Sequence, residues 1–183
     1  MYIYPIIEKQ NVVCYWYRHL LSLIFNKPTS ALKDLEYISE YSNNNSLNFY
    51  VKSRLYEILN NKKFAIYNYT CLIQLKPHMT DAYLHRGLLL ESQKQYSYAV
   101  EDFKNVYQRD CNNIIAIRFL SIYYYKNKIY HEAIKVLSRW INIQPSNHKA
   151  YFLRGKAQAK LNMWTLAYEV RINMYIIIII LQN

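Results

Sequence analysis

The sequence predicts an all-α protein made of about five copies of one helix pair. Alanine recurs every 34 residues, at Ala31, Ala65, Ala99, Ala133 and Ala167. The only two glycines, Gly87 and Gly155, are separated by two of these periods, and so are Pro77 and Pro145. Large apolar residues recur at helical spacing inside each period. A fixed period of this length indicates repeats, each of which is one supersecondary unit.

The period divides the chain without insertion or deletion. An N-terminal extension, 1-11, is followed by predicted units at 12-45, 46-79, 80-113, 114-147 and 148-181. Each unit opens with a large residue, at Tyr15, Phe49, Tyr83, Ile117 and Tyr151. The middle three units have a second one seven residues later, at Tyr56, Leu90 and Tyr124. Seven residues are two helical turns, so the first half of each unit is predicted to be an amphipathic helix.

Small residues and prolines complete the predicted unit. Between the two large positions, four units have a small residue, at Ser53, Gly87, Ser121 and Gly155. In the first unit His19 takes this place. Each alanine belongs to a predicted second helix. In the first four units, apolar residues four and seven positions after the alanine continue the apolar face of this helix. Pro77 and Pro145 are expected to end such helices, because proline lacks the backbone donor that a continuing helix needs.

These columns resemble the tetratricopeptide-repeat (TPR) family, a 34-residue helix-turn-helix with a large-small-large first helix, then alanine, an aromatic residue and proline. The resemblance covers residues 12–181, and it implies a right-handed superhelical solenoid of antiparallel helix pairs. The first unit departs from the pattern at His19, Ser22 and Asn43. A pentatricopeptide array is disfavoured because its unit is one residue longer.

The composition disfavours catalysis. Three scattered cysteines without a CxxC pair favour a reducing compartment. The five histidines show no metal-ligand spacing, and two glycines cannot form a phosphate-binding loop. We therefore expect no enzyme activity, no cofactor and no metal. A secretory signal and an apolar segment of the roughly 20 residues that a bilayer requires are both missing, so a cytoplasmic or nuclear location is expected.

The resemblance also implies a concave groove that binds other proteins and is lined by the first helix of each unit. In the family, the second, fifth, sixth, ninth, twelfth and thirteenth positions of a unit line this groove. In the last two units these positions contain the candidate peptide-groove residues Arg118, Phe119, Ile122, Tyr125, Lys126, Lys149, Phe152, Lys156 and Lys160. They predict an acidic, partly hydrophobic peptide or helix as the partner, although a solvated basic face is the alternative.

Two further functions are compatible with the sequence. Residues 114–183 contain ten basic residues against two acidic ones, so these repeats could bind RNA or another nucleic acid through phosphate contacts and aromatic stacking. The chain could also be a fragment of a larger multi-domain TPR protein. A chaperone-tail carboxylate clamp is not expected, because the lysine, arginine and asparagine positions of that clamp contain Tyr50, Arg54, His85, Ile115 and Phe119.

The seventh position of the unit is basic in four of the five units, at Arg18, Lys52, Arg86 and Arg154. Such repetition indicates a structural role. We expect the stem of Arg86 to pack between helices, with its guanidinium paired to Glu101 or Asp102.

The tail, 171-183, departs from the repeat pattern. Arg171 replaces the expected aromatic residue, and a run of isoleucines covers 176–180. This segment has the composition of an aggregation-prone strand. It is compatible with a truncated array, a hydrophobic edge for dimerisation, or misread coding sequence.

Overall fold

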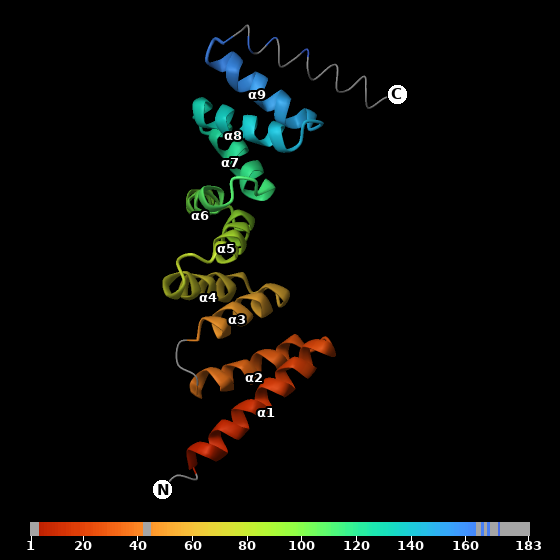
Figure 1. Cartoon of the computed structure of the whole chain (residues 1–183), viewed down its shortest axis with the longest axis vertical. Helices are drawn as coiled ribbons and strands as arrows, with labels where there is room; N and C mark the ends of the chain where they lie inside the picture. The colour runs from red at the N-terminus through yellow and green to blue at the C-terminus, as the bar shows by residue number, and fades with distance from the viewer. Residues whose placement is uncertain (1–3, 42–44, 164–165, 167, 169–171, 173–183) are drawn as a thin grey trace. The chain divides into compact units, whose positions relative to one another are not determined.

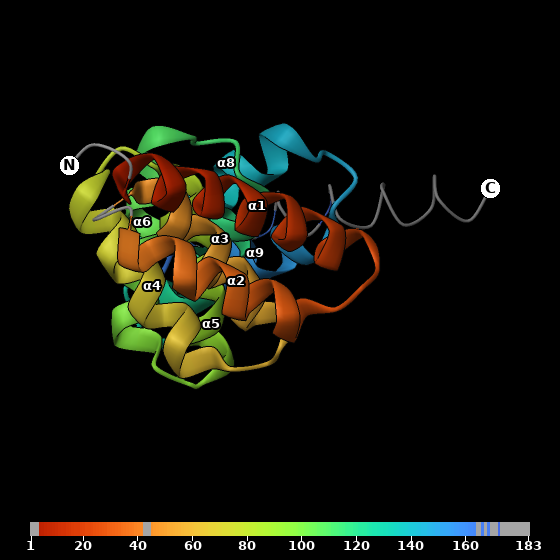
Figure 2. The same ribbon diagram turned by 90° about the horizontal axis from the view of Figure 1, so that it is seen from below.

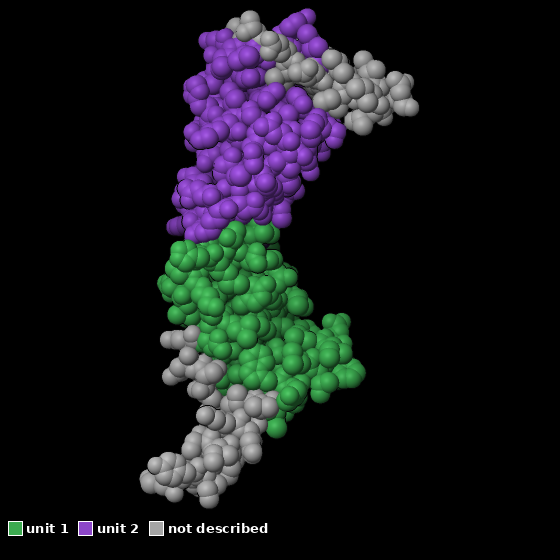
Figure 3. Space-filling model, in the orientation of Figure 1, with its two compact units in different colours: residues 1–89 green, residues 90–183 purple. Residues whose placement is uncertain are grey.

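The computed structural model describes residues 4–41 and 45–163, together with Leu166, Tyr168 and Ile172. Within these residues all regular secondary structure is α-helical, as Figure 1 shows. The chain divides into two compact units, unit 1 with residues 1–89 and unit 2 with residues 90–183, which Figure 3 distinguishes by colour. Each unit buries its own set of apolar side chains.

Unit 1 is a series of helices that pack on their neighbours in the chain. The helices are α1 (Tyr4–Ile24), α2 (Pro28–Tyr41), α3 (Ser46–Ile58), α4 (Lys62–Leu75) and α5 (Thr80–Ser92), whose last residues belong to unit 2. α1 packs on α2, α2 on α3, and α3 on α4, and both ribbon views show α1 beside α2 (Figures 1 and 2). α5 joins α4 through Ala82, which is buried together with Tyr69 and Leu72.

Unit 2 continues the same arrangement. Its helices are α6 (Tyr96–Arg109), α7 (Ile114–Lys126), α8 (Tyr130–Ile143) and α9 (His148–Lys160). α6 packs on α7, α7 on α8, and α8 on α9. The second helix expected in the last unit, with Ala167, lies largely outside the described residues, and so does the isoleucine run of the tail.

Helix boundaries repeat with the period of the sequence. First helices begin at Ser46, Thr80, Ile114 and His148, and second helices begin at Pro28, Lys62, Tyr96 and Tyr130. Each series advances by 34 residues, and the prediction of an all-α fold of helix pairs is confirmed. α1 begins at Tyr4, upstream of residue 12 where the first predicted unit starts.

The second helices supply most of the core. Ala31, Ala65, Ala99 and Ala133 have no exposed surface. The apolar residues four and seven positions after them are also buried: Leu35, Ile38, Tyr69, Leu72, Phe103, Val106, Leu137 and Trp140. Alanine keeps the backbone close to the packed neighbour, while the larger residues fill the space between helices. α4 and α8 end at Leu75 and Ile143, just before the two prolines, as predicted.

His19 stands where other units have a small residue, and the structure shows how it is accommodated. Its side chain is 1% exposed, and its Nδ1 lies 2.8 Å from the carbonyl oxygen of Ala31. The ring also makes an edge contact with Trp16, with centroids 5.6 Å apart. A buried polar ring therefore has a hydrogen-bond partner, which removes most of the cost of its burial.

Each first helix ends in the same turn. The residues Asn26, Asn60, Lys94, Lys128 and Asn162 have φ between 55° and 62° and follow one another at the repeat period. In the second of these turns the Asn60 N–H donates to Glu57 O and the Asn61 N–H donates to Tyr56 O, at 2.9 and 2.8 Å. The other turns have the same pair of bonds. This is the Schellman pattern, which requires a left-handed residue at its centre.

Candidate functional site

A cavity of about 510 Å³ opens beside α7 in unit 2. Four of the predicted groove residues line it, all on α7: Arg118, Phe119, Ile122 and Lys126. Tyr123 and Asn127 complete this wall, and Glu91, Tyr96 and Ser97 form the other side from the end of α5 and the start of α6. Residues three and four positions apart lie on one face of a helix. The spacing of the four predicted residues along α7 therefore explains why they line the same cavity.

The floor of the α7 cavity is aromatic. Phe119 is only 7% exposed, and its ring lies 4.3 Å from Phe103 and 6.0 Å from Tyr123, measured between centroids. Ile122 is 38% exposed and extends the apolar surface outward. Phe119, which was predicted to line the groove, is therefore mainly a core residue, and it also lines the cavity.

Three charged side chains also line the cavity. Arg118 and Lys126 are exposed and lie eight positions apart on α7, which corresponds to about 12 Å along a helix axis. Glu91 lines the cavity from the end of α5 and is half-buried. The cavity therefore combines two cations, one carboxylate and an apolar floor.

The predicted residues of α9 form a separate surface in the same unit. Lys149, Phe152, Lys156 and Lys160 are all exposed, and their spacing places them along one face of the helix. The Lys156 Nζ lies 4.2 Å from the centre of the Phe152 ring, a cation–π contact. None of the four lines the α7 cavity. Tyr125, the remaining predicted residue, packs edge-on against Tyr130.

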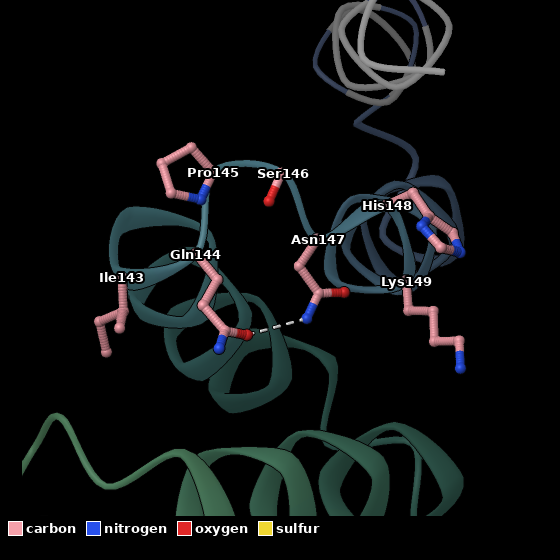
Figure 4. Close-up of a pocket in the computed structure, with 7 residues that line it drawn as sticks. All are labelled: Ile143, Gln144, Pro145, Ser146, Asn147, His148 and Lys149. Atoms are coloured by element: carbon pink, nitrogen blue, oxygen red, sulfur yellow. Dashed lines mark hydrogen bonds between the residues drawn. The ribbon is translucent and has the colours of Figure 1, made fainter. Parts of the chain in front are cut away.

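Lys149 also borders a hollow of about 580 Å³ at the connection between α8 and α9 (Figure 4). The hollow is lined by the consecutive residues Ile143–Lys149. The side chains of Asn147 and Gln144 have structural partners: Asn147 Nδ2 donates to Gln144 Oε1 at 3.2 Å, and Asn147 Oδ1 accepts from the Ala150 N–H at 3.3 Å. The second of these bonds caps the N-terminus of α9. The polar groups of this hollow therefore shape the loop.

Comparison with known proteins identifies the fold. No family model matches the chain, and no curated protein matches it in sequence. Among solved structures, YrrB, described as "a TPR protein with an unusual peptide-binding site", matches 96% of this chain over 91% of its own length, with 16% identity and a TM-score of 0.73. The chain has the tetratricopeptide-repeat fold.

Structures of MamA match the TPR chain to a similar extent. MamA residues 41 to the end from Desulfovibrio magneticus RS-1 align with 91% of the chain over 94% of their own length, at 17% identity and a TM-score of 0.68. MamA AMB-1 aligns with 91% of both chains, at 12% identity and a TM-score of 0.74.

The TPR register explains which cavity residues the sequence could indicate. Glu91 occupies the twelfth position of its unit, so the rule that selected the α7 residues also applies to it. Tyr96, Ser97, Tyr123 and Asn127 occupy no groove position of the family pattern. Tyr123 follows Phe119 by one helical turn, and this spacing alone could have indicated that Tyr123 lies beside Phe119.

The basic seventh position of the TPR unit is structural in the described residues. Arg18 Nε donates to both carboxylate oxygens of Asp34 at 3.0 Å. Arg86 donates to Thr70 Oγ1 at 3.1 Å, and Arg154 donates to Ser138 Oγ at 3.3 Å. Each of the three guanidinium groups also lies over a tyrosine of its own helix, Tyr15, Tyr83 or Tyr151.

The basic residues at the seventh position therefore link neighbouring helices. Lys52 makes a similar bond, from Nζ to Ser39 Oγ at 2.7 Å. Burial lowers the pKa of Arg154, whose guanidinium still remains charged at neutral pH. Arg86 belongs to unit 1, and the two acidic residues that were expected to pair with it belong to unit 2, so that pairing stays a prediction.

Within the described residues, no three metal-ligating side chains gather into a group that could hold an ion. None of the described helices combines the length and the apolar character needed to cross a bilayer. The α7 cavity and the exposed face of α9 are two candidate surfaces of unit 2.

Proposed function

We propose that this TPR protein is a non-enzymatic interaction scaffold that binds a partly acidic peptide or helix against α7. The observation that carries this proposal is the α7 cavity, in which Arg118, Phe119, Ile122 and Lys126 line one space of about 510 Å³. Cavities of this size accommodate a few side chains. The fold supports the proposal, because repeat arrays expose extended surfaces of stacked helices that bind other proteins.

The lining determines what the bound segment should look like. A large apolar side chain would cover Ile122 and the exposed edge of Phe119. Acidic residues on both sides of it would meet Arg118 and Lys126, which lie about 12 Å apart along the helix. Glu91 would repel a carboxylate on the opposite wall. The expected ligand therefore carries two acidic residues that flank an apolar anchor, and it is not uniformly acidic.

A random dodecapeptide display library tests this expectation. The peptides selected by the wild-type chain should be enriched in an apolar residue flanked by Asp or Glu. The double variant Arg118→Glu/Lys126→Glu should lose these peptides, with affinity falling by about tenfold or more. The double variant Lys149→Glu/Lys160→Glu changes the net charge equally and is the matched control, which should retain them. An equal loss in both variants would move the site away from α7.

The second candidate function is nucleic-acid binding through α9. The observation that favours it is the exposed row of Lys149, Lys156 and Lys160 beside Phe152, which is 48% exposed, on a helix without acidic residues. Lysines along one face suit a phosphate backbone, and an exposed aromatic ring can stack on a base.

A random-sequence single-stranded oligonucleotide distinguishes the two functions. It should bind wild type but not Lys149→Glu/Lys160→Glu, and it should leave binding of the selected peptides at α7 unchanged.

A further inference from the structure

The first helix of a unit packs against the second helix of the unit before it. α3 packs on α2, α7 on α6 and α9 on α8. Residues at the sixth position of the unit make this contact. The rings of Phe119 and Phe103 have centroids 4.3 Å apart, and those of His85 and Tyr69 have centroids 5.8 Å apart. Both pairs occupy the same two repeat positions, so the contact belongs to the repeat.

α3 shows which face of a first helix is involved. Leu55, at the tenth position of its unit, is 2% exposed. It belongs to one buried cluster with Ala31, Leu35 and Ile38 of α2, and Val51, at the sixth position, packs against this cluster. The sixth and tenth positions are four residues apart and share one helix face. This face is therefore the surface on which a first helix receives a second helix.

In α1 the equivalent face is uncovered within the described residues. Tyr17 and Leu21 occupy the sixth and tenth positions, and they are 66% and 52% exposed. Leu20 and Ile24 lie on the same side of the helix and are 49% and 75% exposed. Terminal repeats of soluble arrays normally have a polar outer face, and a contiguous exposed apolar patch marks an interaction site. We call these four residues the α1 face.

The last predicted unit exposes apolar side chains at positions that contact a following first helix in earlier units. Tyr168 and Ile172 are helical, and they are 66% and 43% exposed. Ile172 has the repeat position of Glu36, whose Oε1 accepts from the Tyr56 hydroxyl of α3 at 3.2 Å. Tyr168 has the repeat position of Leu32, which packs against the cluster between α2 and α3. Both residues therefore stand where a second helix meets the next first helix.

Charge favours a contact between these two different surfaces over a contact between two α1 faces. Residues 14–33 contain Arg18, Lys27 and Lys33 and no acidic residue, so two copies of this segment would repel each other. Residues 161–183 contain one acidic and one basic residue, Glu169 and Arg171, and are otherwise uncharged and mostly apolar. The α1 face therefore matches the last unit better than it matches itself.

We propose that the α1 face of one copy of the chain receives the segment of a second copy that carries Tyr168 and Ile172. The contact continues the packing of first helix on second helix from one molecule to the next. Because the two surfaces differ, the association is head to tail and can extend beyond a dimer. It does not rest on the peptide-binding function proposed for unit 2, because the α7 cavity takes no part in it.

Complementation between two variants of the full chain tests this contact. Tyr17→Glu/Leu21→Glu blocks the α1 face, and Tyr168→Glu/Ile172→Glu blocks the segment of the last unit. In sedimentation velocity the mass of wild type should rise with concentration. Each variant alone should stay monomeric, with association weakened at least about tenfold, because a carboxylate would be buried in an apolar contact. An equimolar mixture should form heterodimers that grow no further, since one intact surface of each kind remains.

The matched control is Ile58→Glu/Tyr67→Glu, which changes the charge equally at side chains 64% and 63% exposed in unit 1. It should associate as wild type does, and an equal loss there would overturn the proposal. Recovery in the mixture shows that both blocked variants are folded. Serine replaces glutamate at the same positions in any variant whose circular dichroism shows lost helix.

Three further results would contradict the head-to-tail contact. Association of Tyr168→Glu/Ile172→Glu alone, at wild-type strength, would mean that two α1 faces pair with each other. A wild-type chain that stays monomeric throughout the concentration series would mean that something other than a second copy covers the α1 face. A mixture of folded variants that stays monomeric would show that the two surfaces do not meet.

Discussion

Lys94 and Lys128 adopt a left-handed backbone conformation, each with φ of 62°. The equivalent turns of the chain have asparagine at this point, at Asn26, Asn60 and Asn162. For a residue with a Cβ atom this conformation costs roughly 1–2 kcal/mol, while glycine adopts it freely and asparagine tolerates it. The turns at Lys94 and Lys128 therefore contain a backbone cost that the residue type does not offset.

Lys94→Gly and Lys128→Gly are each expected to raise the free energy of unfolding by about 0.5–1 kcal/mol. Urea unfolding followed by circular dichroism measures the change. Lys135→Gly is the matched control, because Lys135 is exposed inside α8, where glycine should lower stability by about 1 kcal/mol. Destabilisation at all three positions would mean that the lysine side chains matter more than the backbone angle.

At the scale of the helix, the side chain of Asn113 caps the N-terminus of α7. Asn113 precedes α7 in extended conformation, and its Oδ1 accepts from the Ala116 N–H at 3.1 Å. α7 presents the cavity residues, so the cap helps to position the proposed site. Asn147 caps α9 in the same way.

Asn113→Ala should lower the free energy of unfolding by about 1 kcal/mol, because one backbone donor at the start of α7 loses its acceptor. Thermal or urea unfolding of the full chain measures this loss. Asn113→Ser keeps an acceptor at the same point and should stay close to wild type. If serine lowered stability as much as alanine, the amide side chain would act through another contact.

Helix pairs could be predicted from the sequence because burial restricts residue type. The described ladder alanines and the apolar residues that follow them are buried, and such positions change little from unit to unit. The turns were not predicted, because their left-handed residue is asparagine in some units and lysine in others, and lysine does not signal this conformation. The asparagine caps could have been found, since Asn45, Asn113 and Asn147 each end a predicted unit.

The candidate site was predictable within one helix but not between helices. Arg118, Ile122 and Lys126 share one cavity because they share a face of α7. α9 contributes a separate row, and α8 packs against both α7 and α9. Family positions say which face of a helix is exposed. The depth of Phe119 depends on its contact with the ring of Phe103 in α6, and a contact between two helices does not follow from the positions of the residues within their units.

At the scale of the whole molecule, a net charge of +11 gives both units an attraction for acidic ligands. Added salt should weaken the approach of acidic ligands to both, because exposed charges are screened within about 10 Å at 0.1 M ionic strength.

Half-buried tyrosines make the stability of the whole chain sensitive to alkaline pH. Burial raises the pKa of Tyr56 in unit 1 and of Tyr107 and Tyr124 in unit 2 above the ordinary value of about 10. The folded state therefore holds these phenol protons more tightly than the unfolded state. The contribution of these tyrosines to the free energy of unfolding is complete below about pH 10 and is lost as the pH rises through their pKa values in the folded state.

The urea midpoint should fall above about pH 10, in step with phenolate absorbance at 295 nm. Tyr107→Phe/Tyr124→Phe should reduce this fall, whereas Tyr98→Phe/Tyr168→Phe, at positions 69% and 66% exposed, should not. An undiminished fall in the first pair would assign the alkaline loss to lysine deprotonation instead.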